Sequence, residues 1–439
     1  MWIAILAVAI GLTIAGAVYL LRRFRRFGIV LAIAGDRKWL QWLVAAAPLL
    51  GFAVYGLFDA VNAVIVVLHL AAFWLIADLV TGIAGLILRK KRGSRTIPAA
   101  NGEEYAAGPV AGKLERADEA GDSHGTLSKA QEATGKRPFR VYWKGVAVIV
   151  VCTIYLAVGW YLAHHVVRTA YTVETDKSLP GGSLRIVQLS DSHVGTLFDG
   201  KEFAEHLRRV QAEQPDIVVF TGDFVDDNTS REDMVIACRA LGELNTTYGV
   251  YFAYGNHDKG YYNSREYTAQ ELDAELRKNG ITVLEDEVKL IAGSICIIGR
   301  KDRNEGDRRA TSDGNQNGTE GKNGSATDGT GKTKGRMTMD EITTGLDRSC
   351  YMIVLDHQPN DYEAEAAADV DLVLSGHTHG GQLIPLGPIG ILIGANDRTY
   401  GTETRGNTTF IVNSGIGDWA IDFKTGTVSE YVVIDVKSK

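Results

Sequence analysis

The sequence is poor in cysteine and has no excess of basic residues. Its four cysteines lie far apart and no two of them form a CxxC pair, which excludes a disulfide framework. The formal net charge is −7 and the isoelectric point lies near 5.9, whereas a general nucleic-acid binder usually presents a basic face. The basic, aromatic-lined groove pattern of single-strand binders is also missing, which disfavours a nuclease. We therefore expect no nucleic-acid partner.

Long apolar runs fill the first 90 residues and recur after Lys144, in a chain whose 439 residues suffice for two or three units. A helix needs about 20 apolar residues to cross a bilayer. Four runs are predicted to span a membrane: Met1–Leu21, Trp39–Phe58, Val61–Leu88 and Val146–His164. A cleaved signal peptide is the competing interpretation of the first run. It is disfavoured because the basic residues follow the apolar stretch instead of preceding it.

Basic residues gather in the segments that join these predicted spans. They lie between the first two spans (22–38), after the third span (89–95) and before the fourth (136–144). Loops rich in Lys and Arg tend to remain in the cytoplasm. The pattern predicts a multi-pass protein of the cell membrane whose N-terminus and whole C-terminal half are extracytoplasmic. An error of one span in the count would reverse this orientation.

Two polar segments are predicted to be disordered, because they hold too few large apolar residues to offset the entropy of ordering. The chain then divides into a three-span region at 1–95, a disordered cytoplasmic loop at 96–143, a fourth transmembrane helix at 144–166 and a domain at 183–439 with a flexible insertion at about 303–335. Asp78, within the third span, is a functional candidate by default. The alternative is that a neighbouring helix satisfies it.

From Ser183 onward, short β-branched runs alternate with amphipathic stretches. The predicted strands are Leu184–Leu189, Ile217–Phe220, Val250–Tyr254, Ser294–Ile298, Tyr351–Leu355, Leu372–Leu374, Thr409–Val412 and Tyr431–Val436. The predicted helices, with apolar residues at helical spacing, include Lys201–Gln214, Arg231–Leu244 and Arg265–Lys278. This alternation indicates an α/β layered domain, in which ligands bind at the carboxyl ends of strands.

Five polar motifs follow predicted strands. In chain order they are Asp191-Ser192-His193, the segment Thr221–Asp226, Gly255-Asn256-His257-Asp258, Asp356-His357-Gln358-Pro359 and the segment Ser375–Gln382. One such motif arises easily by chance, but five at successive strand ends do not. Carboxylate, amide and imidazole groups bind hard and borderline divalent metals. The motifs therefore predict a site for two cations about 3.5–4 Å apart, with glycines before Asp223, Asn256 and His377 that let the backbone turn sharply.

The order DxH, GDxxD, GNHD, H and GHxH resembles the calcineurin-like metallophosphoesterase family. The ending GHTHGGQ, with the later Tyr400-Gly401 and the segment Asn413–Gly417, is similar to its membrane-associated bacterial branch, the YkuE/YaeI-like phosphoesterases. The resemblance covers roughly 183–436 without the insertion. It implies a layered α/β fold of two β-sheets flanked by helices, preceded here by transmembrane helices, and a metal-dependent phosphoric ester hydrolase.

Carried over position by position, the resemblance implies a ligand set for two divalent metal ions (Mn, Fe, Zn or Co). One metal would be held by Asp191, His193 and His379, and the second by Asn256, His357 and His377, with Asp223 bridging the two. His257 matches a histidine beside the leaving group, which Asp258 would orient and polarise, and Asp226 would support the site from outside the ligand set. For Asp258 and Asp226, loop capping without a catalytic part is the alternative.

The implied reaction is attack on phosphorus by a hydroxide that bridges the metals, with His257 protonating the leaving oxygen. The substrate would be a phosphomonoester or phosphodiester. A lipid-linked substrate is a candidate because the membrane part would hold the site near the bilayer. The alternative function is a non-catalytic membrane sensor or scaffold. Related sequences tend to carry Pro and Arg after the GIG turn, where this chain reads Asp418 to Lys424, so substrate preference is open.

Overall fold

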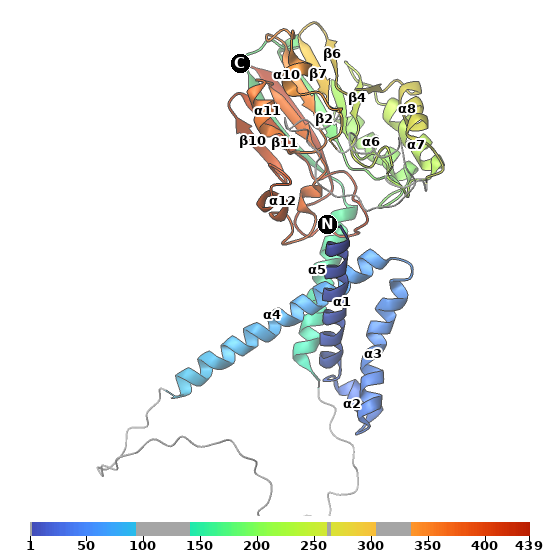
Figure 1. Ribbon diagram of the computed structural model, residues 1–439, viewed down its shortest axis with the longest axis vertical. Helices are drawn as coiled ribbons and strands as arrows, with labels where there is room; N and C mark the ends of the chain where they lie inside the picture. Colours follow the sequence, from blue (N-terminus) through green and yellow to red (C-terminus); the bar gives the residue numbers. More distant parts are fainter. Residues whose placement is uncertain (1, 94–140, 261–264, 304–334) are drawn as a thin grey trace, which may run out of the picture. The chain divides into compact units, whose positions relative to one another are not determined.

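The computed structural model describes residues 2–93, 141–260, 265–303 and 335–439 (Figure 1). The predicted disordered loop at 96–143 and the predicted insertion at 303–335 lie almost wholly outside these residues. Contacts divide the chain into two units. The first comprises Met1–Ala9, Asp59–Val64 and Thr153–Lys439, and the second comprises Ile10–Phe58 and Ile65–Cys152.

Helices make up the described residues before the first strand. They are α1 (Trp2–Phe24), α2 (Gly28–Ala34), α3 (Lys38–Tyr55), α4 (Ala60–Gly93) and α5 (Trp143–His164). Among the residues that the structure describes, three helical segments are long and apolar enough to cross a membrane: Ala7–Phe24, Ala60–Lys90 and Trp143–His164. The predicted span Trp39–Phe58 falls on α3, which is not one of them. The helix α3 has 18 residues, as many as the segment Ala7–Phe24, so length alone does not separate the two. The four-span count therefore stays a prediction.

Asp78 on α4 is paired with cations from two other helices. It forms ion pairs with Arg23 of α1 and Lys144 of α5, and the hydroxyl of Tyr19 donates to it a hydrogen bond of 2.6 Å. A charge within a membrane span is favourable only with such partners. Of the two alternatives for Asp78, the structure shows satisfaction by neighbouring helices.

Two six-stranded sheets form the body of the C-terminal domain (Figure 1). The first has the strand order β1 (Val167–Thr175), β12 (Glu430–Ser438), β2 (Ser183–Leu189), β3 (Ile217–Thr221), β4 (Val250–Ala253) and β5 (Thr282–Val283). The second has the order β10 (Gly401–Arg405), β11 (Thr408–Val412), β9 (Leu372–Ser375), β8 (Tyr351–Leu355), β7 (Ile295–Gly299) and β6 (Glu287–Ile291). The strands β2, β3 and β4 are parallel, as are β7, β8 and β9.

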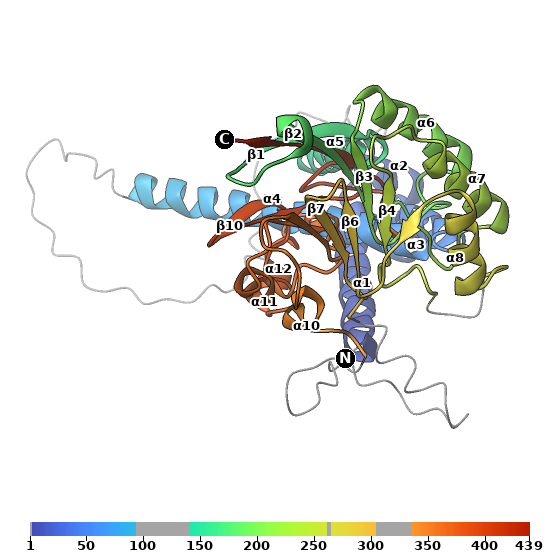
Figure 2. The same cartoon turned by 90° about the horizontal axis from the view of Figure 1, so that it is seen from above.

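Helices cover the outer face of each sheet (Figure 2). They are α6 (Gly200–Ala212), α7 (Arg231–Gly242) and α8 (Ala269–Lys278) on the first sheet, and α10 (Met339–Thr343) and α11 (Tyr362–Ala367) on the second. Alternate residues of β3 point to different cores: Ile217 and Val219 pack between the sheets, whereas Val218 and Phe220 pack against helices. The predicted sandwich of two sheets flanked by helices is thereby confirmed.

The predicted strands are found within two residues at each end, because strands buried on both faces read as continuous apolar runs. Helix α8 begins four residues later than predicted, at Ala269, where Thr268 and Glu271 form a capping box. The edge strands β1, β5, β6 and β10 were not predicted from the sequence. In β10, half-buried and exposed residues alternate in the sequence GTETR, which lacks the apolar run used for prediction.

Candidate metal centre

The polar motifs meet where strands of both sheets end. Asp191 and His193 follow β2, Asp223 follows β3, Asn256 follows β4, His357 follows β8, and His377 and His379 follow β9. Parallel strands present their carboxyl ends at one edge of a sheet, which is where α/β proteins place their ligands. The structure therefore brings the predicted ligands together from two sheets.

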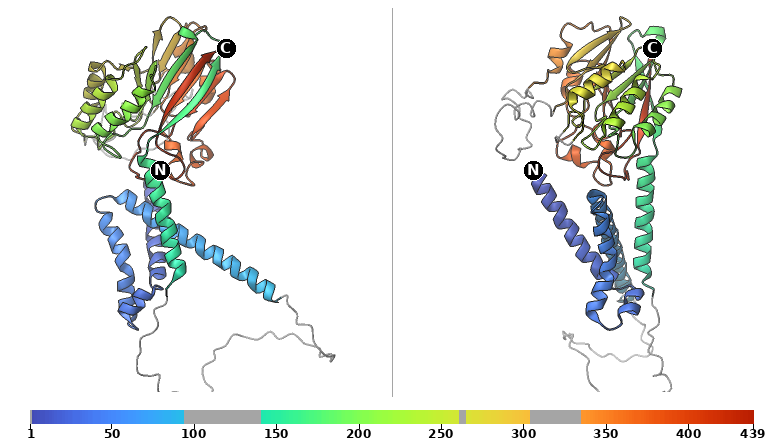
Figure 3. Two further views of the ribbon diagram at one scale, coloured as in Figure 1. Left: turned by 180° about the vertical axis from the view of Figure 1, so that it is seen from behind. Right: turned by 90° about the vertical axis from the view of Figure 1, so that its right-hand side faces the viewer.

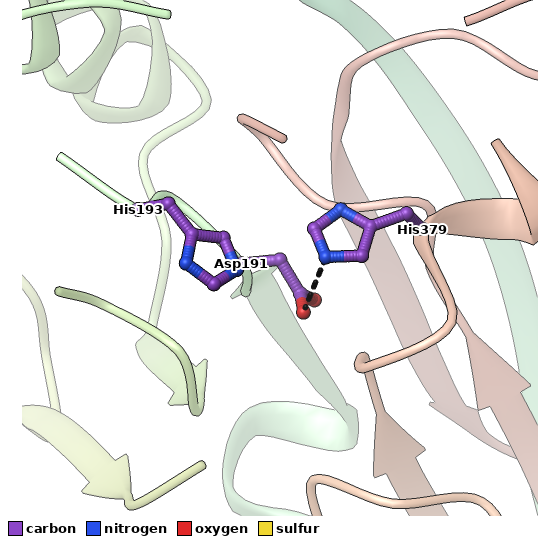
Figure 4. Close-up of side chains that lie close together, drawn as sticks. All are labelled: Asp191, His193 and His379. Carbon is purple, nitrogen blue, oxygen red and sulfur yellow. Dashed lines mark ion pairs between the residues drawn. The ribbon is translucent and has the colours of Figure 1, made fainter. Parts of the chain in front are cut away.

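The first cluster consists of Asp191, His193 and His379, drawn in Figure 4. One potential ligand atom from each side chain lies within 4.8 Å of the other two. Nε2 of His379 is 3.6 Å from Oδ1 of Asp191, and the ring centroids of His193 and His379 are 5.3 Å apart. All three residues are buried. These three are the residues that the resemblance assigned to one metal.

The second cluster consists of Asp223, His357 and His377, again with ligand atoms within 4.8 Å of one another. Nε2 of His357 lies 3.1 Å from Oδ2 of Asp223 and 3.2 Å from Oδ1 of Asn256. The same Oδ2 of Asp223 is 3.7 Å from Nε2 of His193 in the first cluster. Asp223 therefore lies between the clusters, where a bridging carboxylate is expected.

The backbone is strained at five of the seven predicted ligands. These residues have positive φ angles: Asp191 (51°), His193 (39°), Asp223 (54°), His377 (69°) and His379 (48°). Side chains other than glycine adopt this left-handed region rarely, at a cost on the order of 1–3 kcal/mol each. Such strain persists only where the surrounding structure imposes it, and it gathers at functional sites.

Two of the predicted glycines allow the ligand loops to approach one another. A Cβ atom on Gly222, whose φ is +82°, would lie 2.5 Å from the backbone nitrogen of Gly255 and 2.6 Å from Nδ1 of His357. A Cβ atom on Gly376 would clash with the side chains of Asp191 and Ser190. Glycine is required here because any side chain would push the ligands apart.

Asp223 and His357 have strongly displaced pKa values. Burial would raise the pKa of the Asp223 carboxyl, but the adjacent rings of His357 and His257 outweigh burial and hold its pKa well below the ordinary value. Burial would lower the pKa of His357, but Asp223 holds it well above the ordinary value. Burial and the neighbouring His357 lower the pKa of His377 to about 3, which keeps its ring in the neutral form that binds metals.

The donor set fits divalent metal ions. Both ring nitrogens of His193 are fully buried and make no hydrogen bond to any described residue; the nearest carboxylate oxygens belong to Asp226, 3.5 Å from Nδ1, and Asp223. A buried imidazole without hydrogen bonds is costly unless another partner binds it. Two aspartates, one amide and four imidazoles are ligands that borderline metals accept. Binding would release the proton of a charged histidine such as His357.

His257 lies beside the clusters, and its ring centroid is 5.0 Å from that of His193. Burial lowers its pKa to about 4, although Asp223 opposes this effect. Its backbone N–H donates to Oδ1 of Asp223 at 2.7 Å. The position next to the predicted metals is the one that a residue contacting the leaving group would occupy.

Asp258 is buried and bonded to the backbone of two neighbouring loops. Its carboxylate accepts hydrogen bonds from the backbone N–H groups of Asp223, Phe224, Val225 and Gly255, at 2.7–3.1 Å. Burial and the nearby Asp223 raise its pKa to about 7. These contacts tie the β3 loop to the β4 loop, as the loop-capping alternative expects, and the role of Asp258 in orienting the His257 ring stays a prediction.

Asp226 makes a contact of each predicted kind, one to a predicted ligand and one within its own loop. Its Oδ2 is 3.5 Å from Nδ1 of His193, the position expected for a residue supporting a ligand. Its Oδ1 accepts the backbone N–H of Asn228 at 2.8 Å, which stabilises its own loop.

Sequence reasoning missed Asp418. Its Oδ1 is 2.9 Å from Nδ1 of His379, and both residues are buried. Ser190, also missed, donates a hydrogen bond of 2.5 Å to Asn413. The segment 413–418 follows the predicted strand Thr409–Val412, so the rule that ligands lie at strand ends, applied once more, would have identified it.

The comparisons with known proteins agree with this geometry. The family model described as calcineurin-like phosphoesterase matches residues 184–381. An uncharacterized metallophosphoesterase of Aquifex aeolicus is 34% identical over 273 residues, which cover 61% of this chain and 91% of that protein. YkuE of Bacillus subtilis, also an uncharacterized metallophosphoesterase, is 26% identical over 63% of this chain and 88% of its own length.

A third relative is named as a transmembrane protein. The transmembrane protein with metallophosphoesterase domain from Danio rerio is 30% identical, covering 70% of this chain and 65% of that protein. The match to the Aquifex protein over nearly its whole length decides the family. The chain belongs to the calcineurin-like phosphoesterase family, as its strand-end motifs predicted.

Proposed function

We propose that this chain is a membrane-anchored phosphoesterase that works with two divalent cations. One cation would be held by Asp191, His193 and His379, the other by Asn256, His357 and His377, and Asp223 would bridge them. The observation that carries the proposal is the position of Asp223, whose Oδ2 lies 3.1 Å from a nitrogen of one cluster and 3.7 Å from a nitrogen of the other.

Two bound cations would supply an activated water as nucleophile and would offset negative charge on the phosphoryl group. The chain's own residues position these partners. Nε2 of buried His379 lies toward Asp191, and Asp258 holds the loops of Asp223 and Asn256 together through backbone hydrogen bonds. A rigid ligand set keeps the reacting groups in place without reorganisation.

We assign to His257 the role of the acid that protonates the leaving oxygen. Its lowered pKa makes the ring neutral near pH 7, and a neutral imidazole can donate one hydrogen bond. A phosphoryl group beside it would raise its pKa, because a neighbouring negative charge favours the imidazolium form. The substrate charge would thus convert His257 into an acid able to protonate the leaving oxygen.

The apolar helices before the catalytic domain favour a substrate that resides in the membrane. Three long apolar helices and the membrane-spanning relative support membrane association. We propose a multi-pass arrangement with the catalytic domain outside the cytoplasm, from the distribution of basic residues. A phosphoester whose organic part is a lipid would reach such an enzyme by diffusion within the bilayer.

The test uses the full chain in detergent, freed of metal by a chelator and reloaded with Mn, Fe, Zn or Co singly. We expect metal-dependent hydrolysis of model phosphomonoesters or phosphodiesters, and of phospholipids if the lipid proposal holds. Asp223→Asn keeps the shape of the side chain but weakens bridging, so it should abolish the activity. Tight metal binding without hydrolysis of any of these esters would favour a sensor or scaffold instead.

A further inference from the structure

A short segment of the catalytic domain exposes an unusual number of large apolar side chains. In ten residues that include the one-turn helix α12 (Ile389–Leu392), the exposed ones are Ile384, Leu386, Ile389, Ile391, Leu392 and Ile393. Leu392 is 80% exposed and Ile393 is 73% exposed. We call residues 384–393 the apolar loop. Contiguous exposed apolar groups usually mark a binding surface.

The neighbouring segment 424–429 is bonded to the end of α5. The backbone N–H of Lys424 donates to the carbonyl of Gly159 at 2.9 Å, and that of Ser429 donates to Leu162 at 3.0 Å. The Ser429 hydroxyl donates to the carbonyl of Ala163 at 2.6 Å. The last four carbonyls of a helix lack partners within it, so the catalytic domain satisfies those of Leu162 and Ala163. This fixes segment 424–429 against the last turns of α5.

The apolar loop is bonded to that same segment. The N–H of Ile384 donates to the hydroxyl of Thr425 at 3.0 Å, and the N–H of Thr425 donates to the carbonyl of Gln382 at 2.9 Å. One residue, Thr425, therefore separates the loop from the Lys424–Gly159 contact. Figures 1 and 3 show α12 at the end of the domain where α5 enters it.

The position of Gly159 along α5 indicates how deep in the bilayer the Lys424–Gly159 hydrogen bond lies. Gly159 lies five residues before the end of the helix at His164, which is about 7 Å along its axis. Trp160 and Tyr161, next to it, are 50% and 53% exposed. Trp and Tyr on a spanning helix collect at the level of the lipid headgroups. The Ile384 end of the apolar loop, which is bonded to the residue after Lys424, is therefore held near that level.

We infer that the apolar loop, residues 384–393, is a membrane-contact surface of the catalytic domain, with bilayer lipid as its partner. Its side chains enter the interface beside α5, where burial of apolar groups is favourable. Two hydrogen bonds also connect the loop to the segment that holds the predicted ligands His377 and His379. The hydroxyl of Thr378 donates to the carbonyl of Thr399. The hydroxyl of Thr399 in turn donates to the carbonyl of Gly387 in the apolar loop, at 2.7 Å. The inference rests on the proposed function only in requiring that α5 spans the bilayer.

The test places one nitroxide label on the full chain in lipid nanodiscs. The four native cysteines are buried, so an introduced cysteine is the reactive one. Leu392→Cys reports on the apolar loop. Leu290→Cys on β6, 57% exposed, is the matched control on the same domain, and Ile154→Cys on α5, 59% exposed, reports on the membrane helix. Collision of each label with oxygen, relative to a water-soluble nickel complex, measures its depth.

We expect the oxygen-to-nickel ratio at position 392 to exceed that at 290 several-fold, with position 154 higher still. A lipid-exposed label at 154 with an aqueous label at 392 would overturn the membrane-contact surface while leaving the anchor intact. An aqueous label at 154 would overturn both. Spin–spin broadening at 392 that dilution with unlabelled protein removes would assign the loop to a second copy of the chain and overturn the lipid assignment.

Discussion

Oδ1 of Asp418 lies 2.9 Å from Nδ1 of His379, on the side of the imidazole that faces away from Asp191. A carboxylate at the outer nitrogen of a ligand histidine fixes the orientation of the ring and raises its basicity. Asp418 is fully buried, so water cannot replace it. The pair would make the proposed metal binding depend on a residue outside the predicted ligand set.

We therefore expect Asp418→Asn to weaken metal binding by about 10–100-fold, because the amide holds the histidine less strongly. Metal titration of the full chain, followed by the metal content after dialysis, measures this loss. Asp435→Asn is the control, since Asp435 pairs with Arg185 at 2.7 Å on strands β12 and β2. Equal metal affinity in Asp418→Asn and the unmodified chain would show that the contact has no such role.

His257→Ala should separate catalysis from metal binding. Because the ring is assigned to the leaving oxygen and not to a metal, turnover should fall by about 10²–10⁴-fold while metal content stays near normal. Steady-state hydrolysis and elemental analysis of the same preparation measure the two quantities. Loss of both metals together with activity would mean that His257 is a ligand and that its role has been misassigned.

Gly376→Ala should damage the first cluster through its backbone. The added Cβ would clash with the side chains of Asp191 and Ser190, and overpacking of this kind costs about 1–3 kcal/mol. We expect lower thermal stability together with reduced metal content. Gly387→Ala is the matched control, because the nearest atom to its added Cβ would be 3.9 Å away. Similar losses in both variants would contradict the steric account.

Arg300 belongs to an ion network that includes Asp356, the residue before the predicted ligand His357. It lies 3.2 Å from Asp356 and 2.5 Å from Asp361 and is 3% exposed. Arg300→Met should destabilise the protein by less than the roughly 3–5 kcal/mol of a fully broken buried pair, because buried Asp356 keeps its pair with Arg336 while buried Glu365 loses the neighbouring cation. Arg277→Met removes an exposed pair with Asp273 and should cost less than about 1 kcal/mol. Denaturant unfolding of the detergent-solubilised chain compares them; equal costs would contradict the network.

His206 should make stability depend on pH. Burial and the adjacent Arg209 lower its pKa from 6.5 to about 4, and Arg209 donates a hydrogen bond of 2.5 Å to its Nδ1. That bond needs a neutral ring. Because the unfolded chain takes up the proton first, the stabilisation is present above pH 6.5 and is lost as pH falls through about 4.

His206→Gln should therefore flatten the decline of stability over this range. The difference should be on the order of 1–2 kcal/mol, allowing for the partial exposure of the ring. Denaturation midpoints at several pH values between 4 and 7 would measure it. The same slope in both proteins would assign the acid sensitivity to other groups.

Several features of this protein could be predicted from sequence. Strands such as Tyr351–Leu355 were found at their true ends because burial on both faces leaves a continuous apolar run. The six side chains of the two clusters were all named from motifs at strand ends. At Trp39–Phe58 composition correctly identified an apolar helix, α3, but this helix is not among the three described segments apolar enough to cross a membrane.

The sequence by itself determined which residue types stand at each strand end, because the alternation of apolar runs and polar motifs is local. Only the tertiary structure decided which of them touch. Asp258 is adjacent to His257 in the chain, yet its carboxylate binds the backbone of the β3 loop, whereas Asp418 reaches His379 from another segment. The direction of a side chain depends on the backbone angles of its loop, and packing of the two sheets fixes those angles.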